Sequence, residues 1–92
     1  MAEITVARTG DGDPTMFDVR LVDDRSSTEH RVTASNADLE RLSAGRSPED
    51  FVRACFEFLL EREPKESILG SFDLHEIGRY FPEFEREIVN RA

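Results

Sequence analysis

The chain has 92 residues, with 20 acidic residues against 12 basic ones and a net charge of −8 at pH 7. A chain of this length fits one domain with a modest core, and its negative charge disfavours binding to nucleic-acid phosphates or anionic lipids. The sequence has no apolar run of about 18 residues, so no membrane span is predicted.

The cysteine content and the N-terminus both indicate a cytoplasmic protein. Cys55 is the single cysteine, so no intramolecular disulfide can form, which is typical of a reducing compartment. The first residues lack a basic segment followed by an apolar block, so no signal peptide is expected.

Residues 3–34 predict a three-stranded antiparallel β-meander. Apolar and polar residues alternate along the first two strands, as in strands with one buried face, and polar turns separate the strands. The third strand is weaker: Val32 is its only large aliphatic residue, and His30 shares the face of Val32. Its polarity favours a place at the edge or in the solvated part of the sheet. The expected strands are 3–8, 16–22 and 28–33.

Residues 36–91 predict three or four helices. The first is capped by Ser35 or Asn36, carries Leu39 and Leu42, and ends at a glycine. The other helices are expected at 47–60, from Asp73 to about Phe81, and from Pro82 to about Asn90. A single helical turn over 65–69 is expected to place Ile68 and Leu69 against the core. Asp73 with Glu76 resembles a capping box, and Leu74, Ile77 and Phe81 share the inner face of that helix, as Phe84 and Ile88 do in the last one.

The segment Ser47–Leu60 carries the heaviest apolar load and is the expected centre of the core. Ser47 is a suitable N-cap and Pro48 a suitable first helical residue. Its apolar side chains form one broad arc, which needs a sheet on one side and a helix on another. The predicted core residues are Phe51, Val52, Cys55, Phe56, Leu59, Leu60, Leu74 and Ile77, with Phe58 at the edge of the arc.

These elements together predict one α+β domain over residues 1–92. Strands followed by helices favour helices packed on one face of a small antiparallel sheet.

The sequence offers no group of residues suited to catalysis. His30 and His75 each stand next to a glutamate, and adjacent side chains point apart on a strand or a helix. Cys55 lies on the apolar arc and is expected to be inert. No metal-ligand spacing or phosphate-binding loop is present, so no cofactor or metal is predicted. Asp11 and Asp13 resemble a calcium loop only faintly, and a plain turn is expected.

Nucleic-acid binding is a weaker alternative. Arg41, Arg46 and Arg53 could form a local basic patch, and the two helices that carry them could mimic a helix-turn-helix. The overall negative charge opposes this function, and the second helix is too apolar to lie in a groove of DNA.

The aromatic segment Phe72–Phe84 is the best candidate for a functional surface. So many aromatic side chains are hard to bury together in a small core, so some are expected to line an exposed apolar patch for a partner or a homodimer. The alternative is that they clamp the last helix onto the domain. The candidate surface residues are Phe72, Tyr80, Phe81 and Phe84.

Two stretches, LLEREPKESIL at 59–69 and FDLHEIGRYFPEFE at 72–85, carry a family resemblance. The pattern REP…IL…FDL…YFPE resembles that of a group of small bacterial proteins of unassigned function. The resemblance implies a bacterial cytoplasmic domain and no known reaction.

The leading hypothesis is therefore a non-enzymatic protein-interaction or regulatory module that binds a protein partner or a second copy of itself. The alternatives are a small enzyme or ligand-binding protein with a pocket beside His30, between sheet and helices, and a nucleic-acid-binding protein.

Overall fold

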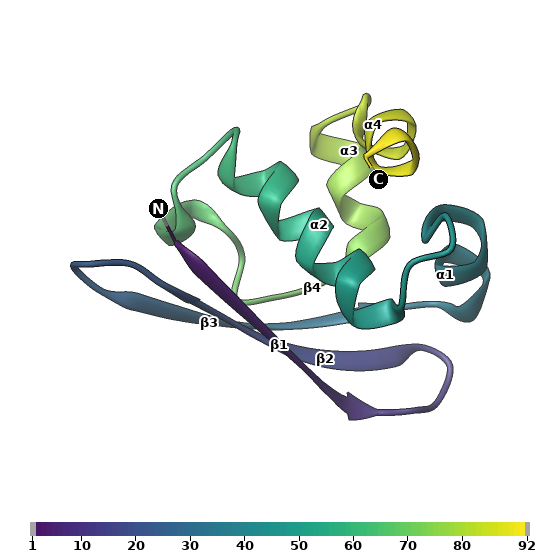
Figure 1. Cartoon of the computed structure of the whole chain (residues 1–92), viewed down its shortest axis with the longest axis horizontal. Coiled ribbons are helices and arrows are strands. Elements are labelled where there is room, and N and C mark those ends of the chain that lie inside the picture. Colours follow the sequence, from purple (N-terminus) through teal and green to yellow (C-terminus); the bar gives the residue numbers. More distant parts are fainter. Residues whose placement is uncertain (1, 92) are drawn as a thin grey trace.

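The computed structural model describes residues 2–91 and shows an α+β fold (Figure 1). A four-stranded sheet forms one layer, and the helices pack on one of its faces. The elements are β1 (Glu3–Gly10), β2 (Thr15–Val22), β3 (Ser27–Ala34), α1 (Asn36–Leu42), α2 (Pro48–Leu60), η1 (Lys65–Ser67), β4 (Ser71–Asp73), η2 (Leu74–Glu76), α3 (Ile77–Tyr80) and α4 (Phe84–Asn90).

The predicted meander is confirmed, with β1 antiparallel to β2 and β2 antiparallel to β3. The structure adds a short fourth strand, β4, which runs parallel to β3 with Phe72 opposite Val32. The strand order is β1-β2-β3-β4, so β3 is an interior strand, and of the two places expected for it the edge is wrong. Its polarity has another explanation, because hydrogen bonds satisfy its buried polar side chain, His30.

The inner face of the sheet carries the alternating apolar residues of each strand. Val19 of β2 lies opposite Val6 of β1 on one side and opposite His30 of β3 on the other. Because directly opposed residues share a face, this register places the apolar residues of the strands beneath α2. The buried side chains on this face include Phe17, Val19, Leu21, Val32 and Ala34.

Helix α2 begins as the sequence predicts. The Ser47 side chain accepts a hydrogen bond from the Asp50 N–H, and Pro48 occupies the first turn. The helix is covered on two sides. Phe56 packs toward the sheet, with ring centroids 5.5 Å from His30 and 6.0 Å from Phe72.

Phe58 packs on the opposite side of α2, against the C-terminal helices. Its ring meets those of Phe84 and Phe81 edge-on, with centroids 5.2 Å and 5.9 Å away. The sequence pattern placed Phe58 at the edge of the apolar arc, and the structure buries it completely. Leu60 differs from its prediction as a core residue, because it is only partly buried at the end of the helix.

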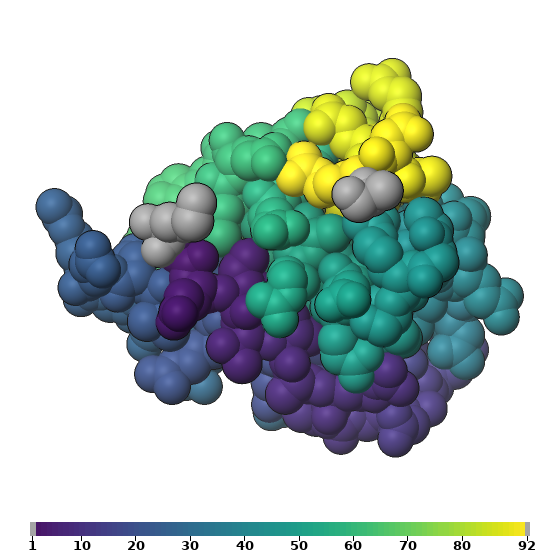
Figure 2. Space-filling model, viewed as in Figure 1, coloured from purple at the N-terminus to yellow at the C-terminus, as the bar shows by residue number. Residues whose placement is uncertain are grey.

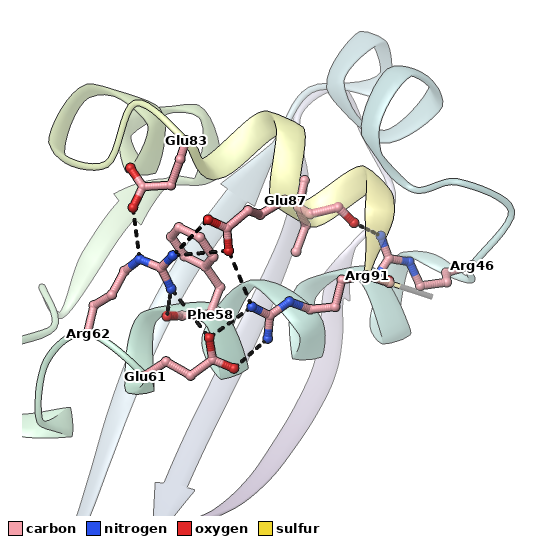
Figure 3. Close-up of polar contacts among 8 residues, drawn as sticks. Arg46, Phe58, Glu61, Arg62, Glu83, Glu87 and Arg91 are labelled. Atoms are coloured by element: carbon pink, nitrogen blue, oxygen red, sulfur yellow. Dashed lines mark hydrogen bonds and ion pairs between the residues drawn. The ribbon is translucent and has the colours of Figure 1, made fainter.

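An arginine network joins α4 to the C-terminal end of α2 (Figure 3). The Arg62 guanidinium lies 3.6 Å from the centroid of the Phe58 ring, and its nitrogens donate to Glu83 and Glu87 at 3.1 Å each. Arg91 donates to Glu61 at 2.8 Å. An isolated seven-residue helix is marginal in water, so α4 depends on these contacts and on burial of its apolar side.

Arg46 closes the end of the same helix. Its guanidinium donates to the backbone carbonyls of Ile88 and Arg91 (Figure 3). The last carbonyl groups of a helix have no partner within it, and Arg46 supplies donors to two carbonyls at this end of the chain.

One face of α2 remains open to water between β1 and the C-terminal helix (Figure 2). Arg53, Glu57 and Glu61 are exposed there. Among residues 2–91, no helix combines the length and apolar character needed to cross a membrane.

The two-sided burial of α2 can be tested with a pair of substitutions. Phe56→Ala should lower the free energy of unfolding by about 3–5 kcal/mol, because it leaves a cavity between α2 and the sheet. Leu60→Ala should cost less than about half as much, because Leu60 already contacts water. Urea denaturation followed by circular dichroism measures both. Equal losses for the two variants would contradict this description of the core.

Candidate functional site

An apolar groove of about 380 Å³ lies beside the C-terminal end of α2. Three segments form it: the end of α2 with the residue Glu63, the stretch from η1 to β4, and the stretch from η2 through α3. Its lining residues are Leu59, Glu63, Ser67, Ile68, Leu69, Phe72, Glu76, Ile77, Tyr80 and Phe81.

The floor of the groove is buried and its walls are exposed. Leu59, Ile68 and Ile77 belong to the hydrophobic core and form the floor. On the walls, Tyr80 keeps 68% of its surface exposed and Leu69 keeps 52%. Large apolar side chains left in water around a concave surface are typical of binding sites.

Three of the four predicted surface residues meet at this groove. Phe72 comes from β4, and Tyr80 and Phe81 come from the end of α3. Residues eight or nine positions apart in the sequence therefore line the same groove. The assignment of Phe84 to an exposed surface is wrong, because it is only 1% exposed. Phe84 stands at the start of α4 and packs edge-on against Phe58, so it clamps the last helix onto the domain.

Leu69 is the wall residue that the sequence interpretation placed incorrectly. The turn at η1 was expected to pack both Ile68 and Leu69 against the core, and only Ile68 is buried. Backbone near Ile68 is extended after η1, so successive side chains point in opposite directions and only one can face inward.

His30 fixes the backbone that carries Leu69. Its Nδ1 lies 2.7 Å from the Leu69 carbonyl oxygen, and because a carbonyl only accepts, the Nδ1–H donates this bond. Its Nε2 lies 2.8 Å from the Thr28 hydroxyl. The ring is 4% exposed and lines neither groove described here, so we assign His30 to positioning the groove wall.

A second groove of about 680 Å³ adjoins the first and shares Glu63 with it. Its apolar floor includes Ile4 and Leu60, and its charged residues are predominantly acidic. The full lining is Ala2, Ile4, Asp23, Glu57, Leu60, Glu61, Glu63, Pro64, Lys65, Glu66 and Arg91.

The two cations of this second groove are already paired. Buried Lys65 donates to Asp23 at 2.6 Å and to Glu66 at 2.5 Å, and Arg91 pairs with Glu61. The Lys65 ammonium, together with backbone N–H groups of the turn, holds the pKa of Asp23 well below its usual range. The remaining carboxylates of the groove, Glu57 and Glu63, form no ion pair within residues 2–91.

Cys55 has no access to a substrate. It is fully buried on α2, and burial raises the pKa of its thiol well above the usual value. A thiol that stays protonated at neutral pH is a poor nucleophile. The sequence interpretation of Cys55 as a small core residue is confirmed.

Among residues 2–91, one cluster of possible metal ligands lies where α1 meets the start of η2. The ligand atoms of Asp38, Asp73 and His75 lie within 4.8 Å of one another. Each is already engaged: His75 Nδ1 lies 2.7 Å from Asp73, Arg41 pairs with Asp38 at 2.8 Å, and the Thr33 hydroxyl donates to Asp73 at 2.7 Å. We therefore assign the cluster to helix capping and ion pairing.

The three arginines proposed as a basic patch make separate contacts. Arg41 pairs with Glu85 at 2.7 Å, Arg46 donates to backbone carbonyls at the end of α4, and Arg53 donates to the Ile4 carbonyl. The helix that a helix-turn-helix would place in DNA is α2, which is largely buried here. No observation on these arginines favours nucleic-acid binding.

Comparisons with protein-family models, with curated proteins and with solved structures find no match to this chain. The resemblance seen in its C-terminal sequence pattern therefore stays a prediction.

The role of His30 predicts a stability effect that its neighbour lacks. His30→Ala should lower the free energy of unfolding by about 2 kcal/mol, because it opens space beside Phe56 and removes the donor to Leu69. Glu29→Ala, on the solvent face, should change it by less than about 0.5 kcal/mol. Urea denaturation measures both. A His30→Ala variant as stable as Glu29→Ala would contradict this role.

The contact between Lys65 and Asp23 predicts a pH dependence of stability. The depressed pKa of Asp23 means that its contribution is fully present above about pH 4 and is lost as pH falls toward its folded-state pKa. Asp23→Asn keeps an oxygen for the turn N–H groups and removes the charge. The stability gap between wild type and Asp23→Asn should therefore narrow below about pH 4.

Urea midpoints measured across this acidic range check the prediction, with exposed Asp24→Asn as the control. A gap that stays constant from neutral to acid pH would show that the carboxylate of Asp23 titrates normally.

Proposed function

We propose that this protein is an interaction module that binds a segment of a partner polypeptide in the apolar groove of Leu69, Phe72, Tyr80 and Phe81. The observation that carries the proposal is the exposure of Tyr80 and Leu69 in the lining of a groove whose floor consists of buried core residues. Aromatic side chains in such positions are typical anchors of protein interfaces.

The construction of the groove also supports binding rather than catalysis. The polar groups in its lining are Glu63, Ser67, Glu76 and the hydroxyl of Tyr80. The carboxylate of Glu76 accepts a hydrogen bond from the Asp73 N–H. Neither histidine nor Cys55 lines it. The groove therefore offers shape and apolar area, which are the means of recognising side chains.

A different polypeptide is favoured over a second copy of this chain. A homodimer built on this groove would bring the same acidic rim against itself, in a protein of net charge −8. Like charges facing each other across an interface oppose association. We therefore expect the protein to be a monomer by light scattering. A dimer that is lost in the Tyr80→Ser variant would instead show that the groove binds a second copy of this chain.

The proposal predicts that binding depends on the exposed groove walls. Peptides selected from a random displayed library against the wild-type protein should lose about tenfold or more in affinity for Tyr80→Ser and for Leu69→Ser. The matched control is Val89→Ser on α4, which removes an exposed apolar side chain outside the groove. Fluorescence anisotropy measures the dissociation constants.

Circular dichroism and urea midpoints establish that the three variants are folded. Peptides that bind Tyr80→Ser and Leu69→Ser as tightly as they bind wild type would contradict the proposed function.

A further inference from the structure

Some carboxylates around the two adjoining grooves form ion pairs, and others do not. In the second groove, five acidic residues face two cations, Lys65 and Arg91. Lys65 is committed to Asp23 and Glu66, and Arg91 to Glu61 and, at 3.9 Å, to Glu87. Glu57 and Glu63 are left without an ion-pair partner among the residues that the structure describes.

These two glutamates hold a particular position. Glu63 lines both grooves, so it stands where the apolar groove opens into the acidic one. Glu57 lies six residues earlier, on the face of α2 that is open to water, and lines the acidic groove only. Leu60 and Ile4 give that groove an apolar floor. A bound polypeptide that leaves the apolar groove past Glu63 therefore enters the second, acidic groove, which has an apolar floor and carboxylates without ion-pair partners.

We infer that the segment bound in the apolar groove carries Lys or Arg residues directly beside its apolar anchors, and that these residues extend past Glu63 into the acidic groove toward Glu57. The inference rests on the proposed function and adds the chemical class of the partner. A basic side chain suits this channel because its methylene stem can cover Leu60 and its charged end can reach a carboxylate.

Charge complementarity gives the expected size of the effect. An exposed ion pair is worth up to about 1 kcal/mol, which corresponds to about fivefold in affinity. Two such pairs together give up to about 25-fold, so we expect a difference of about tenfold between a basic segment and its neutral counterpart, with a strong dependence on salt.

The experiment uses the tightest peptide from the displayed library and a version in which every Lys and Arg is replaced by Gln. Both are titrated against the wild-type protein and against the double variant Glu57→Gln/Glu63→Gln. The control is Glu3→Gln/Glu29→Gln, which makes the same change in net charge on the opposite, solvent-facing side of the sheet. Anisotropy is recorded at about 0.05 M and about 0.5 M NaCl.

The inference predicts that the selected peptides contain basic residues next to apolar ones. The parent peptide should bind Glu57→Gln/Glu63→Gln about tenfold more weakly than wild type at low salt, and the control pair nearly as tightly as wild type. The neutral peptide should bind all three proteins alike.

Two results would overturn the inference and leave the groove proposal intact: selected peptides without basic residues, or equal losses for the two double variants. Peptides whose binding is indifferent to Tyr80→Ser and Leu69→Ser would overturn both, because the groove itself would then be unused.

Discussion

The structure depends on one helix being buried from two directions. Phe56 and Phe58 are two residues apart on α2, so their side chains point about 200° apart. Phe56 meets the sheet through His30 and Phe72, and Phe58 meets the C-terminal helices through Phe81 and Phe84. Because the short elements after α2 are too small to be stable alone, this helix and the arginines at its end determine where they lie. The apolar groove forms where these elements converge at the end of α2.

Much of the fold follows from periodicity. Residues alternate along β1 and β2, and Ser47–Leu60 carries an apolar arc, so each of these elements must bury one side. In the structure β1 pairs with β2 and α2 buries its apolar arc, as predicted. Strand β4 could not be predicted, because three residues are too few for an alternating pattern and its parallel partner lies 40 positions earlier in the chain. The interior place of β3 depends on β4, so it was missed for the same reason.

The candidate site was only partly predictable. The aromatic segment identified Phe72, Tyr80 and Phe81, but composition could not separate them from Phe84, whose burial depends on the ring of Phe58. Leu69 was missed because its exposure follows from the extended backbone after η1. The unpaired state of Glu57 and Glu63 cannot be inferred from sequence, since it depends on which carboxylates Lys65 and Arg91 contact in three dimensions.

In the proposed function, polypeptide segments bind against the floor and walls of the apolar groove. Methyl NMR during titration with a library-selected peptide tests this binding, because the groove contains methyl groups from Ile68, Leu69 and Ile77. These signals should shift first and furthest, while those of Leu39 and Ile88 stay in place. Shifts concentrated at Leu39 or Ile88, with the groove methyls unchanged, would contradict the proposed function.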